Sequence, residues 1–188
     1  NDGPDYSGEI VARDIGISIW GDGYSKRLND EDAAKFFPKR ARNVNKGNFG
    51  KTAVFGGSKN FPGSALLSLS ALSALRTGPG YSCLAVPECV YNAVAGRNPE
   101  CTMTAFPDDG EKIVYDEEKI KSLFKYDSIA FGMGVGVNEN VYKTLSYIIK
   151  NYTGNFVVDA DGLNALSLFG TDILKEKSCK IVLTPHVG

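Results

Sequence analysis

The sequence predicts an α/β fold of three layers, in which a mostly parallel sheet carries helices on both faces. From Lys51 onward, short runs of apolar and β-branched residues alternate with segments of helical pattern. Strands of nearly continuous apolar character are typical of parallel sheets, because crossover helices bury both faces. A chain of 188 residues is long enough to bury such a core within one domain.

The N-terminal part is expected to hold less regular structure. Residues 9–19 are rich in β-branched residues and predict a strand, whereas residues 20–30 are rich in glycine and polar residues and predict a linker. Asn29 or Asp30 is the predicted N-cap of a short helix, which Pro38 ends.

Apolar runs bounded by glycine, proline or polar residues predict the strands of the sheet. They lie at residues 52–57, 81–87, 101–106, 127–132, 155–162 and 179–185. Apolar residues at helical spacing predict the helices between these strands. They lie at residues 62–77, 87–96, 116–126, 138–151 and 163–170. The first of these helices has Pro62 in its first turn and Gly78 beyond its end, as helices commonly do.

The charge balance bounds the expected partners. A formal net charge of −1 gives no electrostatic reason to expect nucleic acid or an anionic membrane. The one basic cluster, residues 38–46, is interpreted as a solvated loop, with a local phosphate contact as the alternative. No apolar run approaches the roughly 20 residues of a membrane span, and the start shows no signal-peptide pattern.

The cysteines indicate a reducing compartment. Cys83, Cys89, Cys101 and Cys179 form no CxxC pair, and the chain has one histidine to join them. Such an arrangement does not predict a zinc site or any other metal site. Scattered thiols in a chain of this length behave as small buried hydrophobes, so we expect a cytoplasmic protein.

Glycine or polar clusters follow four of the predicted strands. They are "GGS" (Gly56 to Ser58), "GMGVG" (132–136), "DADGLN" (159–164) and "TPHVG" (184–188). Ligands of parallel sheets bind outside the carboxyl ends of the strands, and these ends meet at one edge. The sequence therefore predicts a binding site at this edge.

The cluster "GMGVG" has two interpretations. It resembles a dinucleotide fingerprint loosely, since it reads GxGxG and not GxGxxG, and it can equally be a structural turn. A helix that begins at Asn138 would present free backbone N–H groups to a phosphate or another anion. The sequence contains no Walker A loop, no GxSxG elbow and no convincing Ser/His/Asp order.

The polar residues of the last two clusters also leave alternatives open. Asp159 and Asp161 could contact a ribose hydroxyl, a metal or a phosphate-bound water. Alternatively, Asp161 caps the helix through Ala165, and Asp159 binds a neighbouring loop. His186 is either a surface residue or a ligand contact at a strand end.

Ordered motifs give the chain a family resemblance from about Arg40 to its last residue. They are "KGNFGKTAVFGGS", "PGSALLSLSALSALRTGPG", "GMGVG", "VVDADGLNAL" and "LTPHVG". Together they resemble the ADP- or ATP-dependent NAD(P)H-hydrate dehydratases of the ribokinase-like superfamily. "SGEIVARDIGIS" (7–18) resembles the closing strand of the epimerase domain that precedes the dehydratase in bifunctional enzymes. The resemblance thus implies an epimerase tail at 1–19, a linker at 20–30 and the N-terminal two-thirds of a dehydratase domain at 31–188.

The resemblance implies a repair reaction on nicotinamide nucleotides. The substrate is the S-epimer of hydrated NADH or NADPH, and ADP or ATP is the phosphoryl donor, with Mg²⁺. Phosphoryl transfer to the ring hydroxyl and subsequent elimination restore the dihydropyridine; such transfer depends mainly on positioning and electrostatic stabilisation. A homo-oligomer is implied, with a tetramer among the expected states.

Motif matching also implies which residues line the site. Those expected to face the hydrated nucleotide are Ser64, Ala65, Gly134, Gly136 and His186. Those expected to line the pocket or its mouth are Lys46, Gly47, Gly57, Ser58, Asp161 and Asn164. Lys46 and Gly47, with Phe49 and Gly50, match the family's "KGxFG" segment.

The chain departs from the family pattern in several places. Asn45, Met133 and Pro79 stand where the family usually has histidine, proline and alanine. The family's catalytic aspartate lies in a "GTGD" motif that the resemblance places beyond Gly188. We therefore expect no catalytic residue in these residues, an incomplete sheet at the C-terminus, an inactive fragment and self-association through an exposed apolar edge.

Two other functions remain open at this level. One is a ribokinase-like kinase of a small vitamin precursor, such as a thiazole alcohol or hydroxymethylpyrimidine, which would share the fold and the sheet-edge site. The other is a non-catalytic nucleotide-binding or assembly fragment.

Overall fold

The computed structural model describes residues 8, 29–37, 39–69 and 74–186. The chain divides into two compact units, Asn1–Lys39 and Arg40–Gly188. In the first unit, helix α1 spans Asp30–Ala34, and the side chain of Asn29 accepts a hydrogen bond from the Asp32 N–H at 2.8 Å. The predicted Asn29 cap is therefore confirmed. The strand predicted at 9–19 lies outside the described residues, as does most of the predicted linker.

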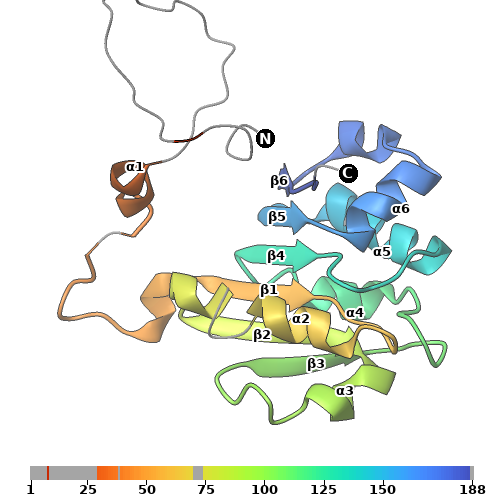
Figure 1. The fold of residues 1–188 in the computed structure, drawn as a ribbon, viewed down its shortest axis with the longest axis horizontal. Helices are drawn as coiled ribbons and strands as arrows, with labels where there is room; N and C mark the ends of the chain where they lie inside the picture. The colour runs from red at the N-terminus through yellow and green to blue at the C-terminus, as the bar shows by residue number, and fades with distance from the viewer. Residues whose placement is uncertain (1–7, 9–28, 38, 70–73, 187–188) are drawn as a thin grey trace, which may run out of the picture. The chain divides into compact units, whose positions relative to one another are not determined.

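The described part of the second unit holds a six-stranded sheet of order β3-β2-β1-β4-β5-β6, in which neighbouring strands are all parallel (Figure 1). The strands are β1 Lys51–Phe55, β2 Tyr81–Pro87, β3 Thr102–Phe106, β4 Ser128–Phe131, β5 Asn155–Val158 and β6 Lys180–Leu183. Each coincides with a predicted apolar run, except that β1 begins one residue before its run and β5 ends at Val158, four residues before the end of the run predicted at 155–162. The predicted α/β class with a parallel sheet is confirmed.

The helices also lie where the apolar spacing predicts them, except that α6 begins at Asp161, two residues before the predicted 163–170. They are α2 Pro62–Leu69, α3 Glu88–Val94, α4 Glu117–Ser122, α5 Glu139–Asn151 and α6 Asp161–Phe169. The helix predicted at 62–77 differs at its end, because Ala74–Thr77 forms the 3₁₀ turn η3, in which the Thr77 hydroxyl donates to the Ala74 carbonyl at 2.8 Å. Two further 3₁₀ turns, η2 at Lys46–Phe49 and η4 at Asp172–Glu176, were not expected from the sequence.

Alternation along the strands divides the core between two faces of the sheet. Val54 packs with Ala65 and Leu69 of α2 and with residues of α3. Its neighbour Phe55 packs in a second cluster with residues of α4, α5 and α6. Because successive strand residues point to opposite faces, the two clusters are separate layers on either side of the sheet. The expected three-layer arrangement follows.

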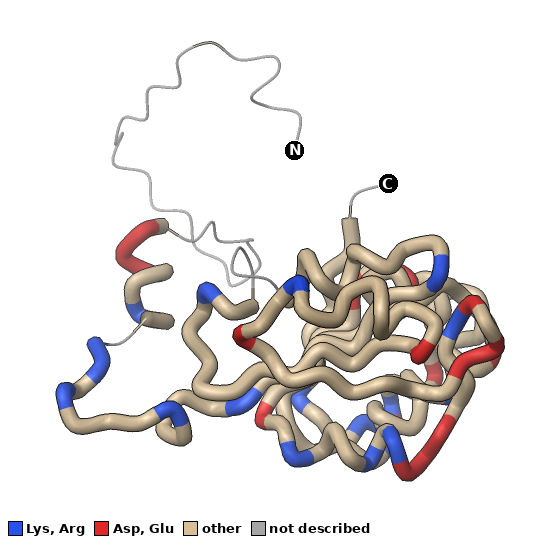
Figure 2. Tube along the Cα trace, turned by 90° about the horizontal axis from the view of Figure 1, so that it is seen from below, with Lys and Arg blue, Asp and Glu red and all other residues tan. Residues whose placement is uncertain are grey.

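Strand β6 ends the described sheet and is its most exposed strand. Val182 and Leu183 are 56% and 40% exposed, and Leu168 of α6 is 68% exposed. Acidic and basic residues are interspersed along the second unit (Figure 2). Among the described residues, no helix is long and apolar enough to cross a membrane.

Candidate functional site

The loops that follow β1, β4 and β5 meet at the carboxyl edge of the sheet, toward which the strand arrows point in Figure 1. Backbone hydrogen bonds join them in sequence. Gly57 donates to the Met133 carbonyl at 2.8 Å, and Asp161 donates to the Gly132 carbonyl at 3.1 Å. The clusters that the sequence placed at strand ends are thus held together as one surface, as parallel strands require.

Helix α2 approaches the loop 132–136 at Gly134. This glycine has φ 70°, and a Cβ built on it would lie 2.6 Å from Ser64 Oγ and 2.8 Å from Phe61 Cβ. Any side chain here would be strained and would displace the first turn of α2. The structure therefore brings Ser64 and Gly134 into direct contact. Ala65 lies beside them, fully buried against the loop after β1.

Asp161 fixes the far end of the same loop. Its Oδ2 accepts the Gly136 N–H at 2.8 Å, and its Oδ1 accepts from the Asn164 amide at 3.2 Å. The expectation that Asp161 caps α6 is wrong, because the N-cap is Ala160, with φ 45° and no side-chain cap bond. The Asp161 carboxylate belongs to the first helical turn and is directed to the glycine loop instead.

The neighbouring polar groups are occupied by backbone partners. Asp159 Oδ1 accepts the Ala160 N–H at 2.7 Å, so it binds its own loop and not a neighbouring one. Asn138 caps α5 by accepting the Val141 N–H at 2.8 Å. That bond satisfies one of the free N–H groups that an anion could otherwise use at this helix start.

His186 follows β6 at the same edge of the sheet and is exposed. A further backbone hydrogen bond joins the segment after β6 to the end of β5, because the Thr184 N–H donates to the Val158 carbonyl at 3.2 Å. Among the described residues, no hydrogen bond or ion pair of the His186 side chain is found. The structure places this residue near the end of β5 without fixing its ring.

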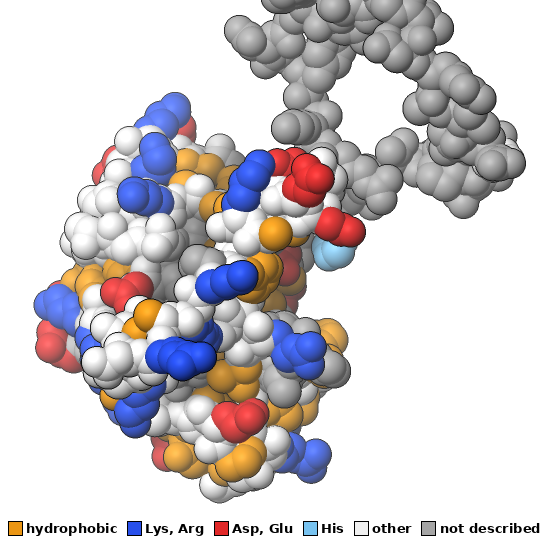
Figure 3. All heavy atoms as spheres, turned by 90° about the vertical axis from the view of Figure 1, so that its left-hand side faces the viewer, with side chains coloured by type: hydrophobic (Ala, Val, Ile, Leu, Met, Phe, Trp, Pro, Cys, Tyr) orange, Lys and Arg blue, Asp and Glu red, His pale blue; other side chains and the backbone are white. Residues whose placement is uncertain are grey.

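Lys46 and Gly47 lie at the opposite, amino edge of the sheet. They belong to η2, which precedes β1, and the Lys46 ammonium lies 4.8 Å from the Tyr81 ring centroid. The length of β1 separates them from Gly57 and Ser58 by roughly 16 Å. Figure 3 views this end of the sheet and shows Lys and Arg side chains on it. The structure does not bring these two residues together with the carboxyl-edge loops.

Comparison with known proteins distinguishes the dehydratase family from the ribokinase-like kinases of vitamin precursors. A family model described as NAD(P)H-hydrate dehydratase matches residues 52–188. The chain belongs to the NAD(P)H-hydrate dehydratase family. The resemblance carried by the sequence motifs is therefore confirmed, and a vitamin-precursor kinase is disfavoured.

Dehydratases of known sequence are similar to most of this chain. The bifunctional NAD(P)H-hydrate repair enzyme Nnr of Dictyoglomus turgidum is 34% identical over 194 residues, which is 98% of this chain and 37% of that protein. The ADP-dependent (S)-NAD(P)H-hydrate dehydratase of Listeria monocytogenes is 24% identical, over 87% of this chain and 55% of that protein. The chain thus spans little more than a third of the length of the Dictyoglomus relative.

Solved structures show the same fold. The ADP/ATP-dependent NAD(P)H-hydrate dehydratase of Bacillus subtilis, co-crystallised with ATP and Mg²⁺, matches with a TM-score of 0.62 and 24% identity, over 84% of this chain and 52% of that chain. A ribokinase-like superfamily protein of Enterococcus faecalis matches with a TM-score of 0.59 and 19% identity, over 79% of this chain and 49% of that chain. The fold is therefore ribokinase-like.

Two residues at this edge of the dehydratase fold were not expected from the sequence. Phe61 is 55% exposed and contacts the Gly134 position from the loop before α2. Lys112 comes from the loop after β3, and a Cβ built on Gly136 would lie 2.6 Å from its Cε. Nothing in the sequence around Phe61 or Lys112 signals its contact with a glycine far along the chain.

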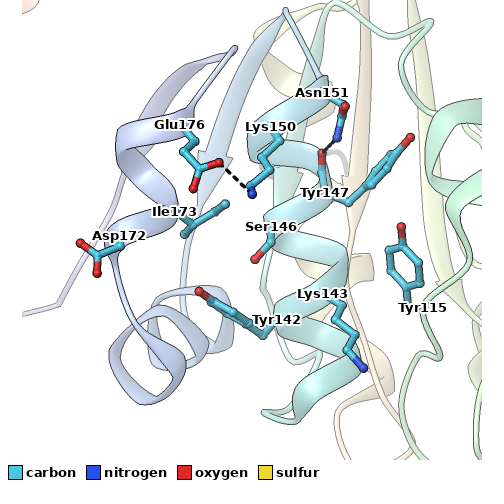
Figure 4. A pocket seen from close by; sticks show the side chains of 10 residues that line it. All are labelled: Tyr115, Tyr142, Lys143, Ser146, Tyr147, Lys150, Asn151, Asp172, Ile173 and Glu176. Carbon is cyan, nitrogen blue, oxygen red and sulfur yellow. Dashed lines mark hydrogen bonds and ion pairs between the residues drawn. The ribbon is translucent and has the colours of Figure 1, made fainter.

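A cavity lies elsewhere, over the outward face of α5 (Figure 4). It has a volume of about 610 Å³, and Tyr115, Tyr142 and Tyr147 contribute to its lining. The Lys150 ammonium in its wall is paired with the Glu176 carboxylate at 2.8 Å. None of the residues that the family motifs single out lines this cavity, so we assign the candidate site to the carboxyl edge of the sheet.

Proposed function

We propose that this chain serves in the ADP- or ATP-dependent dehydration of the S-epimer of hydrated NADH or NADPH, a repair reaction on nicotinamide nucleotides. The single observation that carries the proposal is the joining of the glycine loops of β1 and β4 at one sheet edge, in a chain of the dehydratase family. The names of the Listeria and Bacillus relatives support ADP or ATP as the donor.

The proposed roles follow from where each residue lies. Ser64, Gly134 and Gly136 form the surface that binds the hydrated nucleotide, and His186 contacts it from the end of β6. Asp161 is a positioning residue, because its carboxylate holds the Gly136 N–H. This surface is supported by Gly57, Ser58, Ala65 and Asn164. At the amino edge of the sheet, the proposed nucleotide contacts are Lys46 and Gly47.

The reaction consists of two steps at the nicotinamide ring. The ring hydroxyl loses its proton as its oxygen bonds to the terminal phosphorus of the donor. The donor's terminal phosphorus–oxygen bond breaks, so ADP leaves as AMP, or ATP as ADP, and the poor leaving group of the ring becomes a phosphate ester. The carbon–oxygen bond then breaks, phosphate leaves, and loss of a proton from the adjacent carbon restores the double bond. The loops described here bind and orient the ring.

The resemblance also implies Mg²⁺ for the donor phosphates, and this can be tested against the side chains present. Among the described residues, no group of three or more His, Cys, Asp and Glu side chains is placed to hold a metal ion. The Asp159 carboxylate is bound to the Ala160 N–H and that of Asp161 to the Gly136 N–H. These residues therefore do not form a Mg²⁺ site by themselves.

Three wider features are part of the proposal. Residues 1–19 are the tail of an epimerase domain and 20–30 a linker, which the alignment of 98% of the chain with a bifunctional relative supports. The chain forms a homo-oligomer, supported by the exposed Val182 and Leu183 of β6. It works in the cytoplasm, supported by four cysteines that are all free thiols.

A chimera tests the proposal on these residues. Residues 52–188 replace the matching segment of the Dictyoglomus turgidum enzyme, and the absorbance of reduced nicotinamide is followed after ADP is added to hydrated NADH. With ADP, we expect both the chimera and the parent enzyme to restore the absorbance of reduced nicotinamide. Without ADP, we expect neither to restore it. A chimera that folds like its parent and restores no absorbance would overturn the proposal.

A further inference from the structure

The loop between β3 and α4 carries a turn that is unusually well fixed. Asp108 and Ile113 form an antiparallel bridge across it. Within the turn, Asp109 Oδ1 accepts the Glu111 N–H at 3.0 Å and the Lys112 N–H at 2.8 Å. The Asp109 N–H in turn donates to the Lys112 carbonyl at 3.1 Å. These bonds within the turn fix the backbone on both sides of Lys112.

The same turn is tied to the loop that follows β1 and to the first turn of α3, which follows β2. The Glu111 carbonyl accepts the Lys59 N–H at 2.8 Å, and Asp108 Oδ2 accepts the Cys89 N–H at 2.6 Å. Both partners lie just beyond the carboxyl ends of their strands. The turn that carries Lys112 is therefore held at the proposed site and does not extend freely into solvent.

The Lys112 stem lies on the glycine loop of the proposed site. A Cβ built on Gly136 would lie 2.6 Å from Lys112 Cε and 2.9 Å from its Cδ. The packed stem brings the ammonium to the loop in which Asp161 holds the Gly136 N–H. Among the described residues, no ion pair of the Lys112 ammonium is found.

We propose that Lys112 binds a phosphate group of the nucleotide at this edge. The inference rests on the proposed function and adds a residue that no family motif supplies. An ammonium that forms no ion pair among the described residues, on a preformed turn and beside Gly136, suits a phosphate oxygen as its ligand, although the Asp109 carboxylate of the same turn also interacts with its charge. The phosphate comes either from the nicotinamide nucleotide or from the adenine nucleotide donor.

Calorimetric titration of the chain with NADPH and with ADP tests this inference. We expect Lys112→Met to weaken binding of at least one nucleotide about tenfold, because a charge-assisted hydrogen bond is lost. Methionine keeps an unbranched stem over Gly136, so the fold is retained. Lys112→Arg keeps the charge and is expected to bind within about threefold of the wild type. Lys119→Met, on the exposed side of α4, is the matched control and leaves binding unchanged.

A second readout separates charge from packing. The wild-type affinity falls as salt rises, and this dependence becomes weaker in Lys112→Met. A loss confined to NADPH assigns the phosphate to the nicotinamide nucleotide, and a loss confined to ADP assigns it to the donor. If Lys112→Met binds both nucleotides with the same affinity and the same salt dependence as the wild type, this inference is overturned and the proposed function still stands. If the wild-type chain binds neither nucleotide, the proposed function and this inference fail together.

Discussion

Gly136 donates its backbone N–H to Oδ2 of Asp161 at 2.8 Å, across 25 residues of sequence. This bond connects the loop after β4 with the first turn of α6, which follows β5. From the sequence, the Asp161 carboxylate was expected either to cap a helix or to contact a ligand. The candidate site therefore depends on Asp161 for the shape of its glycine loop.

Substitution of Asp161 tests this dependence. Asp161→Ala leaves the Gly136 N–H without its acceptor, and we expect a loss of about 1–3 kcal/mol in the free energy of unfolding. Asp161→Asn retains a side-chain oxygen and is expected to lose less. Denaturant unfolding of the two variants and the wild type measures the difference; equal stability of the alanine variant and the wild type would contradict the assigned role.

The contact between Gly134 and Ser64 predicts a coupled pair. Gly134→Ala places a methyl group 2.6 Å from Ser64 Oγ at φ 70°, and we expect a cost of about 1–3 kcal/mol. Ser64→Gly removes the closest atoms, so the double variant is expected to recover about 1 kcal/mol relative to the sum of the single effects. The recovery is partial because the backbone strain at residue 134 and the contact with Phe61 Cβ at 2.8 Å remain. A double-mutant cycle in denaturant measures the coupling, and additive effects would count against this contact.

The strands, the helices and the shared sheet edge could be predicted because they depend on local patterns. Apolar runs and helical spacing fix where elements lie, and parallel pairing then places all carboxyl ends at one edge. The Ala160 cap could not be predicted, since aspartate is the preferred cap and alanine at φ 45° is a strained choice.

The residues of the site were predictable to different degrees. Ser64 and Gly134 came from motif matching, and the structure brings them into contact. The contact of Lys112 with Gly136 could not be inferred, because it depends on how the turn after β3 folds back over the sheet. Lys46 is adjacent to β1 in sequence but lies at its other end, so closeness in sequence does not place it with the glycine loops.

The thiol of Cys89 gives a chemical test of the turn that contains Asp108. Burial raises the pKa of this thiol above its ordinary 9.0, and the Asp108 carboxylate raises the pKa further. Asp108→Asn keeps an acceptor for the Cys89 N–H but removes the charge, so the thiolate fraction at neutral pH rises. We expect alkylation of Cys89 to quicken roughly twofold. Cys101, whose pKa is raised chiefly by its own burial, is the internal control in the same mass-spectrometric measurement.

The pH dependence of stability reports on Asp109. Hydrogen bonds from the Lys112 and Glu111 N–H groups hold the pKa of its carboxyl below the ordinary 3.8. A lowered folded-state pKa stabilises the fold above 3.8, and this contribution is lost as pH falls through the lower folded value. The stability difference between the wild type and Asp109→Asn is therefore expected to shrink in that acidic range. A carboxyl titration by NMR with a midpoint at or above 3.8 would contradict the geometry of the turn.

Amide chemical-shift mapping of the chain titrated with NADPH tests directly whether the carboxyl edge of the sheet binds the nicotinamide nucleotide. We expect saturable shifts at Gly57, Gly134, Gly136 and Asp161, with no comparable change at Tyr147 in the cavity over α5. Shifts confined to that cavity, or their absence from the four edge residues at saturation, would contradict binding at this edge.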